Sequence, residues 1–329
     1  MPADFPQHSH RLCVAPMMQH TTRHCRYFHR LLSPHARLYT EMLTTGAILH
    51  GDRRRLLRHH PAEHPLALQV GGSEPRAMAR VARIAEDYGF DEININAGCP
   101  SDRVQRGRFG ACLMAEPQRV ADCVAAMRSA ATLPVTVKTR IGIDHQDDEA
   151  FLYRFVDTVA AADCRLFIIH ARKAWLSGLS PKANREVPPL DYGRVHRLKR
   201  ARPELTIVLN GGITEPGQVQ NQLQQVAGVM LGRAAYQYPY LLAQLEQRLY
   251  GDAPLSRRQA VASMQAYANA HKGTPIQHIS RHMLGLFHGC HGGRQWRRQL
   301  SEHAHHADAG PALLTAALPP LQTPVPEAA

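Results

Sequence analysis

The chain has 329 residues, of which 44% are hydrophobic and 20% charged, and this globular balance excludes a collagen, a long coiled coil and an extensively disordered chain. Its 39 Lys and Arg against 27 Asp and Glu give a formal net charge of +12, which favours a polyanionic partner such as nucleic acid. Most of these cations are Arg, which suits bidentate phosphate contacts, but a genome rich in Arg codons explains the bias equally well.

The cysteines and the N-terminal segment favour a cytoplasmic protein. The 7 cysteines are widely spaced and include no C-x-x-C pair, which argues against a disulfide framework and a zinc finger. The segment MPADFPQHSHRL lacks the layout of a signal peptide, and no apolar run reaches the ~18 residues of a membrane helix. We expect no membrane association and no obligate protein partner, while the oligomeric state is not indicated.

Short β-branched runs alternate with helical patterns through the first three quarters of the chain. The predicted strands are residues 12–15, 38–40, 66–70, 92–96, 135–139, 166–170, 206–210 and 228–231. Three predicted helices begin with an acid and a proline, which suit the first turn: Glu74-Pro75, Glu116-Pro117 and Glu215-Pro216. Eight βα units predict a TIM (β/α)8 barrel, which typically has about 250 residues. A doubly wound sheet is the alternative, although the chain has neither G-x-G-x-x-G nor a P-loop.

The strand patterns stop near residue 242, and helical patterns occupy residues 256–306. We therefore predict a barrel domain at 1–243 that carries the active site and a small all-helical domain at 244–308. The remaining residues, 309–329, are rich in Ala and Pro and predict a flexible tail.

The active site of a TIM barrel lies at the carboxyl ends of its strands, and here these ends carry polar or turn-forming residues. A single polar residue at such a position is usually structural, but several around one barrel mouth predict a functional site. After the last two strands, Asn210-Gly211-Gly212 and Gly232-Arg233 predict a phosphate site, because glycines let backbone N–H groups approach an anion and Arg adds donors. Two ordinary tight turns are the alternative interpretation.

Cys99 lies in the loop NAGCPS after the fourth predicted strand. Free cysteines are most often small buried hydrophobes, but a loop thiol with an ordinary pKa near ~8.5 could also serve as a general acid. A nucleophile paired with His170 is a further possibility. His303, His305 and His306 could bind a metal, but a solvated surface segment is the favoured interpretation, so we predict no metal site.

Several long segments have the character of family motifs. They are NINAGCPS (94–101), VKTRIG (137–142), IIHARKAWLSGLSPKANRE (168–186), NGGI (210–213) and MLGRAAY (230–236). These resemble the tRNA-dihydrouridine synthase family. Four more stretches resemble its A subfamily: TEMLTTGAILHG (40–51), SDRVQRGRFGACLMAEP (101–117), PPLDYGRV (188–195), and RHMLGLFHG with RQWRR (281–298). The resemblance extends over about residues 11–306.

The resemblance implies an FMN-binding TIM barrel that takes electrons from NADPH and reduces uracil C5=C6 in the tRNA D-loop, at positions 20 and 20a. It implies hydride transfer from reduced flavin N5 to C6, protonation of C5 by Cys99, and a uracil held by Asn96. The implied cofactor-binding residues are Pro16, Met17, Met18, Gln69, Lys138, His170, Asn210, Gly211, Gly212, Gly232 and Arg233. The candidates for contact with the substrate and its RNA are Arg140, Arg172, Lys182, Arg185, Arg294, Arg297 and Arg298. A solvated surface cation is the alternative for the last five of these.

Three other functions fit parts of the pattern. A flavin barrel acting on free dihydropyrimidines or small enones would share the flavin residues, but the Arg excess and the helical domain favour RNA. A non-enzymatic RNA-binding protein would need neither flavin nor Cys99. Neither this RNA-binding protein nor a structural oligomer with an inactive barrel explains the polar strand ends.

Overall fold

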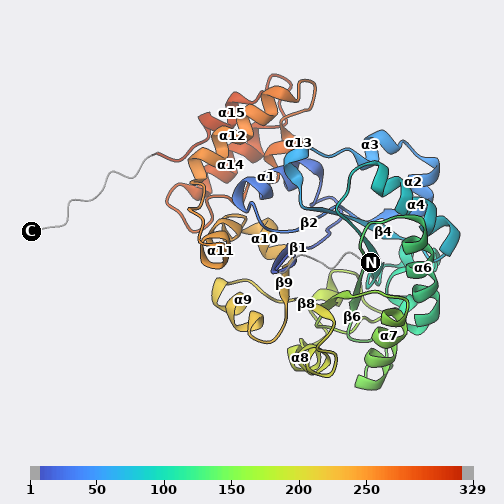
Figure 1. Cartoon of the computed structure of the whole chain (residues 1–329). Helices are drawn as coiled ribbons and strands as arrows, with labels where there is room; N and C mark the ends of the chain where they lie inside the picture. Colours follow the sequence, from blue (N-terminus) through green and yellow to red (C-terminus); the bar gives the residue numbers. More distant parts are fainter. Residues whose placement is uncertain (1–7, 321–329) are drawn as a thin grey trace, which may run out of the picture. The chain divides into compact units, whose positions relative to one another are not determined.

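The structure is a computed structural model that describes residues 8–320, and the chain divides into two compact units. The first unit contains the chain up to Arg26 and His35–Gly232. At its centre is a parallel barrel with the strand order β1-β9-β8-β7-β6-β5-β4-β2, and β3 pairs with β4 (Figure 1). The strands are β1 (Leu12–Val14), β2 (Leu38–Tyr39), β3 (Leu43–Thr44), β4 (Leu66–Gly71), β5 (Glu92–Ala97), β6 (Val135–Arg140), β7 (Leu166–His170), β8 (Thr206–Asn210) and β9 (Gly228–Leu231).

The barrel closes between β1 and β2. Arg37, which precedes β2, exchanges backbone hydrogen bonds of 2.9 Å with Leu12 and Val14 of β1. The predicted TIM barrel is therefore confirmed, and the open doubly wound sheet is excluded. All eight predicted strands are present, and no predicted strand end differs by more than one residue. The short strand β3 was not predicted.

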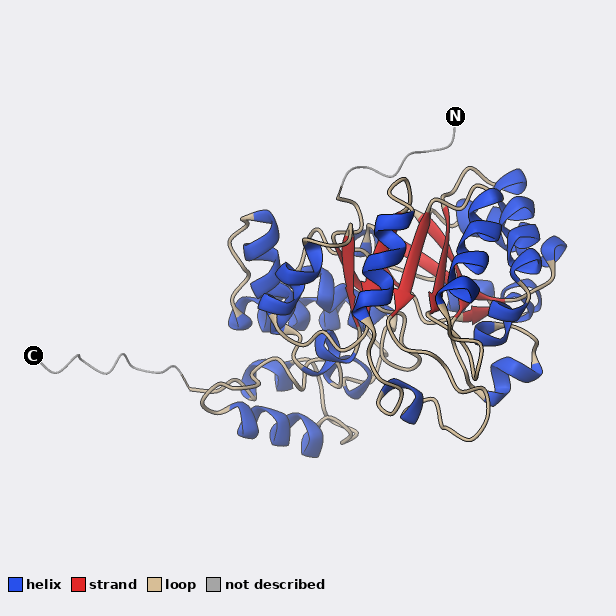
Figure 2. Ribbon diagram, turned by 90° about the horizontal axis from the view of Figure 1, so that it is seen from below, coloured by secondary structure: helices blue, strands red, loops and turns tan. Residues whose placement is uncertain are grey.

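Helices cover the outside of the strands (Figure 2). The helices of this unit are α2 (Thr45–His50), α3 (Arg53–Leu57), α4 (Pro75–Asp87), α5 (Asp102–Arg106), α6 (Pro117–Ala130), α7 (Glu149–Ala161), α8 (Tyr192–Ala201) and α9 (Pro216–Leu223), and α1 (Arg23–Leu32) begins in it and ends in the second unit. The three predicted acid-proline starts are confirmed at α4, α6 and α9. At α4, the Glu74 carboxylate accepts the backbone N–H groups of Arg76 and Ala77, which have no partner within the helix.

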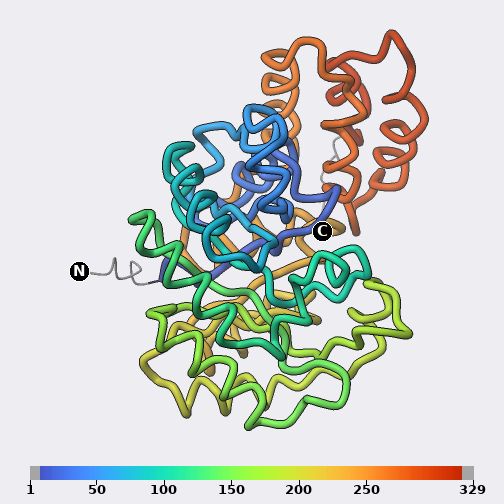
Figure 3. Tube along the Cα trace, turned by 90° about the vertical axis from the view of Figure 1, so that its right-hand side faces the viewer, coloured from blue at the N-terminus to red at the C-terminus, as the bar shows by residue number. Residues whose placement is uncertain are grey.

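The second unit consists of Tyr27–Pro34 and the chain from Arg233 onward. Its other helices are α10 (Arg233–Gln237), α11 (Tyr240–Tyr250), α12 (Arg257–Ala270), α13 (Gln277–Ser280), α14 (Gly293–His303) and α15 (Ala312–Ala316), drawn in orange to red in Figure 3. Trp296 is fully buried, and its indole N–H donates to the Met283 carbonyl at 3.0 Å. Within this unit, the Ser33 hydroxyl donates to the Glu246 carboxylate at 2.5 Å.

The boundaries of the units differ from the sequence-based ones in two respects. The second unit begins at Arg233 rather than at residue 244, and it includes the end of α1, a segment from the other end of the chain. In addition, the stretch predicted as a flexible tail contains α15, because Pro311 begins a helix whose Leu314 is fully buried. The rest of that stretch, 321–329, lies outside the described residues. Within 8–320, every helix is too short or too polar to span a bilayer.

A buried carboxylate lies in the barrel interior. Glu92, the first residue of β5, has no exposed surface, and its Oε1 accepts from the hydroxyls of Tyr39 (2.9 Å) and Thr136 (2.6 Å). Its Oε2 lies 2.7 Å from His10 Nε2 and 3.3 Å from the Arg37 guanidinium. Burial alone would raise the pKa of Glu92, but His10, Arg37 and Thr136 lower it to about 2. The carboxylate is therefore ionised at neutral pH.

Replacing Glu92 by Gln should destabilise the protein in a pH-dependent manner. The pKa of Glu92 is lowered from 4.5 to about 2, so the ionised carboxylate should contribute about 3 kcal/mol above pH 4.5. This contribution is lost as the pH falls from 4.5 to 2, and the difference between wild type and variant should shrink over that range. Urea denaturation at several pH values measures it. The exposed Glu204→Gln is the control, and a pH-independent difference for Glu92→Gln would contradict the assignment.

Candidate active site

The strand register brings the predicted site residues together at the carboxyl end of the barrel. Asn96 of β5 is paired with Lys138 of β6. His170 of β7 is paired with Arg140 on one side and with Asn210 of β8 on the other. Because neighbouring strands are parallel, these side chains lie in adjacent positions around one mouth.

The loop that contains Cys99 is bound to β5 through Asn96. Asn96 Oδ1 accepts the backbone N–H groups of Gly98 (3.1 Å) and Cys99 (3.0 Å), while its Nδ2 donates to Gln69 Oε1 at 2.9 Å. On the opposite side of the loop, the Cys99 carbonyl accepts the backbone N–H of Ala111 at 2.9 Å. The position of Cys99 is thus determined by backbone hydrogen bonds on both sides.

The Cys99 thiol itself is half-buried and has a hydroxyl neighbour. Its Sγ lies 3.6 Å from Ser101 Oγ, within hydrogen-bond distance for sulfur. Among the residues that the structure describes, neither the Cys99 thiol nor the His170 ring makes a hydrogen bond to the other. The role of Cys99, as a general acid or as a nucleophile, stays a prediction at this point.

Two basic side chains at the mouth have lowered pKa values. Lys138 Nζ donates to Asn210 Oδ1 at 3.0 Å, and burial together with the neighbouring Arg140 lowers its pKa to about 7. Burial and four cations, Arg140 the strongest of them, lower the pKa of His170 well below its usual value. His170 is therefore neutral at pH 7, and Lys138 is charged in only part of the molecules.

The two glycines after β8 have backbone conformations that favour glycine. Gly211 has φ +116°, and a Cβ there would lie 2.6 Å from the His170 ring. Gly212 has φ +70°, and its Cβ would lie 2.4 Å from Leu190. At Gly232, after β9, a Cβ would approach only Ala15, at 3.8 Å, so space remains beside this backbone. Arg233 follows directly and begins α10.

Arg140 joins two loops at the site through three backbone carbonyls. It is 4% exposed, and its guanidinium donates to the carbonyls of Gly98 (3.0 Å), Lys173 (3.0 Å) and Asn184 (2.8 Å). Asn184 is fully buried and bonds in turn to the backbone of Trp175. Arg140 therefore fixes the Cys99 loop and the loop after β7 relative to each other, whereas its predicted contact with substrate stays a prediction.

The remaining predicted residues are more exposed. Pro16, Met17 and Met18 follow β1, and Met18 is exposed over 57% of its surface. Arg172 donates to the carbonyls of Glu186 and Pro188. Lys182, which precedes the short 3-10 helix Ala183–Arg185, and Arg185, which ends it, are both exposed. In the second unit, Arg294, Arg297 and Arg298 are exposed on α14 and line a shallow hollow with Ser301. None of these placements tests the predicted roles.

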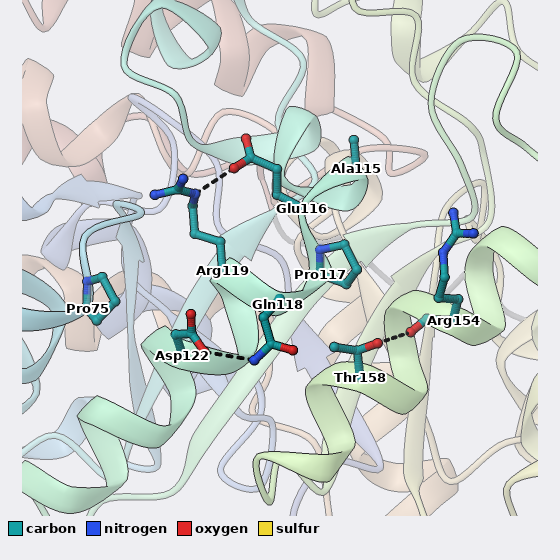
Figure 4. A pocket seen from close by; sticks show the side chains of 9 residues that line it. All are labelled: Pro75, Ala115, Glu116, Pro117, Gln118, Arg119, Asp122, Arg154 and Thr158. Atoms are coloured by element: carbon teal, nitrogen blue, oxygen red, sulfur yellow. Dashed lines mark hydrogen bonds and ion pairs between the residues drawn. The ribbon is translucent and has the colours of Figure 1, made fainter.

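A second surface hollow is lined by residues of three helices. It is formed by the start of α6 together with Pro75 of α4 and Arg154 and Thr158 of α7 (Figure 4). Glu116 and Arg119 form an ion pair of 2.6 Å at its edge. None of the predicted site residues lines this hollow, so it is separate from the candidate active site.

Sequence reasoning missed three buried polar residues that organise the site: Glu92, Thr136 and Asn184. Glu92 and Asn94 share the two-residue spacing of Asn96, and Thr136 shares that of Lys138 and Arg140. This alternation indicates a polar barrel interior and could have identified two of them. No comparable local signal identifies Asn184, which lies in a loop.

Comparisons with known proteins show similarity over most of the chain. A family model described as "Dihydrouridine synthase (Dus)" matches residues 13–321. A protein of Shewanella oneidensis, named tRNA-dihydrouridine(20/20a) synthase, is 58% identical over 314 residues, which cover 94% of this chain and 93% of that protein. Proteins with the same name from Vibrio cholerae and Xanthomonas campestris are each 57% identical, over 92% and 91% of this chain and 94% and 90% of their own lengths.

Replacing Gly211 by Ala should disturb the site by straining the backbone at this position. The added Cβ has no room beside His170, and φ +116° is strained for any side chain, so we expect a loss of about 1–3 kcal/mol in unfolding free energy. Urea denaturation of the variant measures this loss. Gly217→Ala is the matched control, because nothing lies near its Cβ and α9 tolerates alanine. Equal stability of the two variants would contradict the prediction.

Proposed function

Because the chain belongs to the dihydrouridine synthase family, we propose that it reduces uridine to 5,6-dihydrouridine in tRNA, using bound FMN that NADPH reduces. From the names of the relatives, we propose uridines 20 and 20a of the D-loop as the targets. The observation that carries the proposal is Cys99, a half-buried thiol held by Asn96 at the barrel mouth.

The residues at the mouth fit FMN. The backbone at Gly211 and the open space beside Gly232 suit a phosphate group, with Arg233 as a further donor. Lys138 has donors left beyond its bond to Asn210, and a negative charge placed near it would raise its pKa above 7 and keep the ammonium charged. His170, being neutral, can donate or accept a hydrogen bond without adding charge. When bound and reduced, FMN would supply the hydride for uracil C6.

The protein's own residues complete the addition of two hydrogens. Cys99 holds a proton on Sγ and transfers it to uracil C5 as the general acid. Ser101 Oγ, 3.6 Å from that sulfur, can then donate to the thiolate that remains. Asn96 holds both the uracil and the Cys99 loop. The general acid and the nucleobase that it protonates are therefore positioned by the same side chain.

The charge of the protein supports a folded RNA as the substrate. The net charge of +12 suits many phosphate contacts, and Arg294, Arg297 and Arg298 present guanidinium groups on one helix. A uracil must leave its stack to enter a barrel mouth, and this costs least in a loop. These arguments favour tRNA over a free pyrimidine or enone. Equal rates on free uridine and tRNA would favour that second class of substrate.

The Cys99→Ala variant tests the proposed reaction. Purified protein is incubated with NADPH and tRNA that lacks dihydrouridine, and the product is mapped by mass spectrometry. We expect a gain of two hydrogens in the D-loop for the wild type and a reduction of at least ~100-fold in rate for Cys99→Ala, because the general acid is lost. Cys112→Ala, which changes another half-buried thiol, should retain activity. A wild-type protein that binds flavin but leaves this tRNA unchanged would refute the proposed substrate.

The arginines of α14 should contribute to the salt dependence of tRNA binding. Replacing Arg294, Arg297 and Arg298 together by Ala should weaken binding and reduce the slope of log K against log[salt] by about 2–3, about one per lost phosphate contact. The matched control replaces the exposed Arg76, Arg80 and Arg83 of α4, with the same loss of charge. Equal effects of the two triple variants would indicate a general effect of charge rather than a contact surface on α14.

A further inference from the structure

A continuous chain of hydrogen bonds crosses the barrel interior from Glu92 to the Cys99 loop. Thr136 Oγ1 donates to Glu92 Oε1 (2.6 Å), and Asn94 Nδ2 donates to Thr136 Oγ1 (2.8 Å). Gln69 Nε2 donates to Asn94 Oδ1 (2.8 Å), and Asn96 Nδ2 donates to Gln69 Oε1 (2.9 Å). Finally, the Cys99 backbone N–H donates to Asn96 Oδ1 (3.0 Å). We call Glu92, Thr136, Asn94, Gln69 and Asn96 the interior chain. All but Asn96 are buried.

The ionised carboxylate gives this chain a direction. A carboxylate only accepts, so the Thr136 hydroxyl must donate to Glu92 and can only accept from Asn94. Asn94 must therefore present its Nδ2 to Thr136 and its Oδ1 to Gln69. The same reasoning applied to Gln69 leaves Asn96 with Nδ2 toward Gln69 and Oδ1 toward the loop. A reversal at any link would place two donors or two acceptors face to face in a buried site.

The far end of the chain requires the same direction. The backbone N–H groups of Gly98 and Cys99 can only donate, so they need an oxygen, and Asn96 Oδ1 is the atom that accepts both. Among the residues that the structure describes, the second Nδ2 hydrogen of Asn96 has no acceptor. That hydrogen can be taken only by an acceptor, such as a carbonyl oxygen of a uracil ring, and not by an amino group.

We propose that Glu92 and Thr136 are positioning residues: through Asn94 and Gln69 they fix the amide orientation of Asn96, which holds the Cys99 loop and offers the substrate base an N–H donor. The inference rests on the proposed function for the meaning of Cys99. The hydroxyl of Thr136 is the link that can be removed with least change of shape, since Val has nearly the same volume. The substitution Thr136→Val also leaves Glu92 in contact with His10, Arg37 and Tyr39.

Thr136→Val tests the proposal with two readouts. Steady-state dihydrouridine formation should show kcat reduced about tenfold or more, with the KM for tRNA changed much less, because a misplaced acid slows the chemical step. Independently of activity, the Cys99 peptide should be alkylated by iodoacetamide several-fold faster, because the loop has lost a fixed anchor. Thr136→Ser, which restores the hydroxyl, should return both values toward the wild type.

Thr139→Val is the matched control. Thr139 is equally buried on the same strand, but its hydroxyl donates to the Ala97 carbonyl, outside the interior chain. Both readouts should stay within about twofold of the wild type. Equal effects of the two Val variants, or a Thr136→Val variant with unchanged kcat and unchanged Cys99 alkylation, would overturn the proposal.

Glu92→Gln provides a second variant if Thr136→Val does not fold. Its amide can donate as well as accept, so the chain loses its fixed direction, and the same loss of kcat and faster alkylation of Cys99 are expected at a temperature where the variant is folded. Unchanged kcat and alkylation in that variant would contradict the inference. If the wild type forms no dihydrouridine, the proposed function fails, but the alkylation rates still support or contradict the interior chain.

Discussion

The architecture depends on one buried negative charge, the carboxylate of Glu92. Its donors and its cation come from different parts of the barrel: His10 precedes β1, Arg37 precedes β2, and Thr136 is on β6. Arg37 also makes the backbone hydrogen bonds that close the barrel between β1 and β2. Desolvating a carboxylate is expensive and is offset only when several donors surround it, as they do here. The carboxylate thus connects the closing seam to strands across the interior.

Backbone groups, rather than side-chain pairs, hold the loops of the candidate active site. Asn96 accepts two backbone N–H groups, and Arg140 donates to three backbone carbonyls. At Gly211 the absence of a Cβ lets the chain approach the His170 ring. Because such contacts depend on the course of the chain, they fix the position of Cys99 whatever the neighbouring surface side chains are. This suits a site in which an acid must meet one carbon of a base extruded from RNA.

The barrel could be predicted because local sequence patterns identify its strands and the starts of its helices. Each strand is a short apolar run and each acid-proline pair marks a helix start, so the eight βα units follow from the order of the chain. The features that no local pattern identifies depend on contacts between distant segments. The end of α1 belongs to the helical unit through tertiary contacts, and α15 is held by burial of Leu314 in a stretch whose composition indicates disorder. Asn184 likewise acquires its role only when folding brings Arg140 beside it.

The barrel mouth combines positive charge with groups that are not fully charged. The pKa of His170 is lowered by burial and then by Arg140, Lys138, Arg172 and Arg185. Burial and then Arg140 lower the pKa of Lys138 to about 7. A negative charge bound beside Lys138 would favour the protonated ammonium, so proton uptake at this side chain would accompany the binding of such a group.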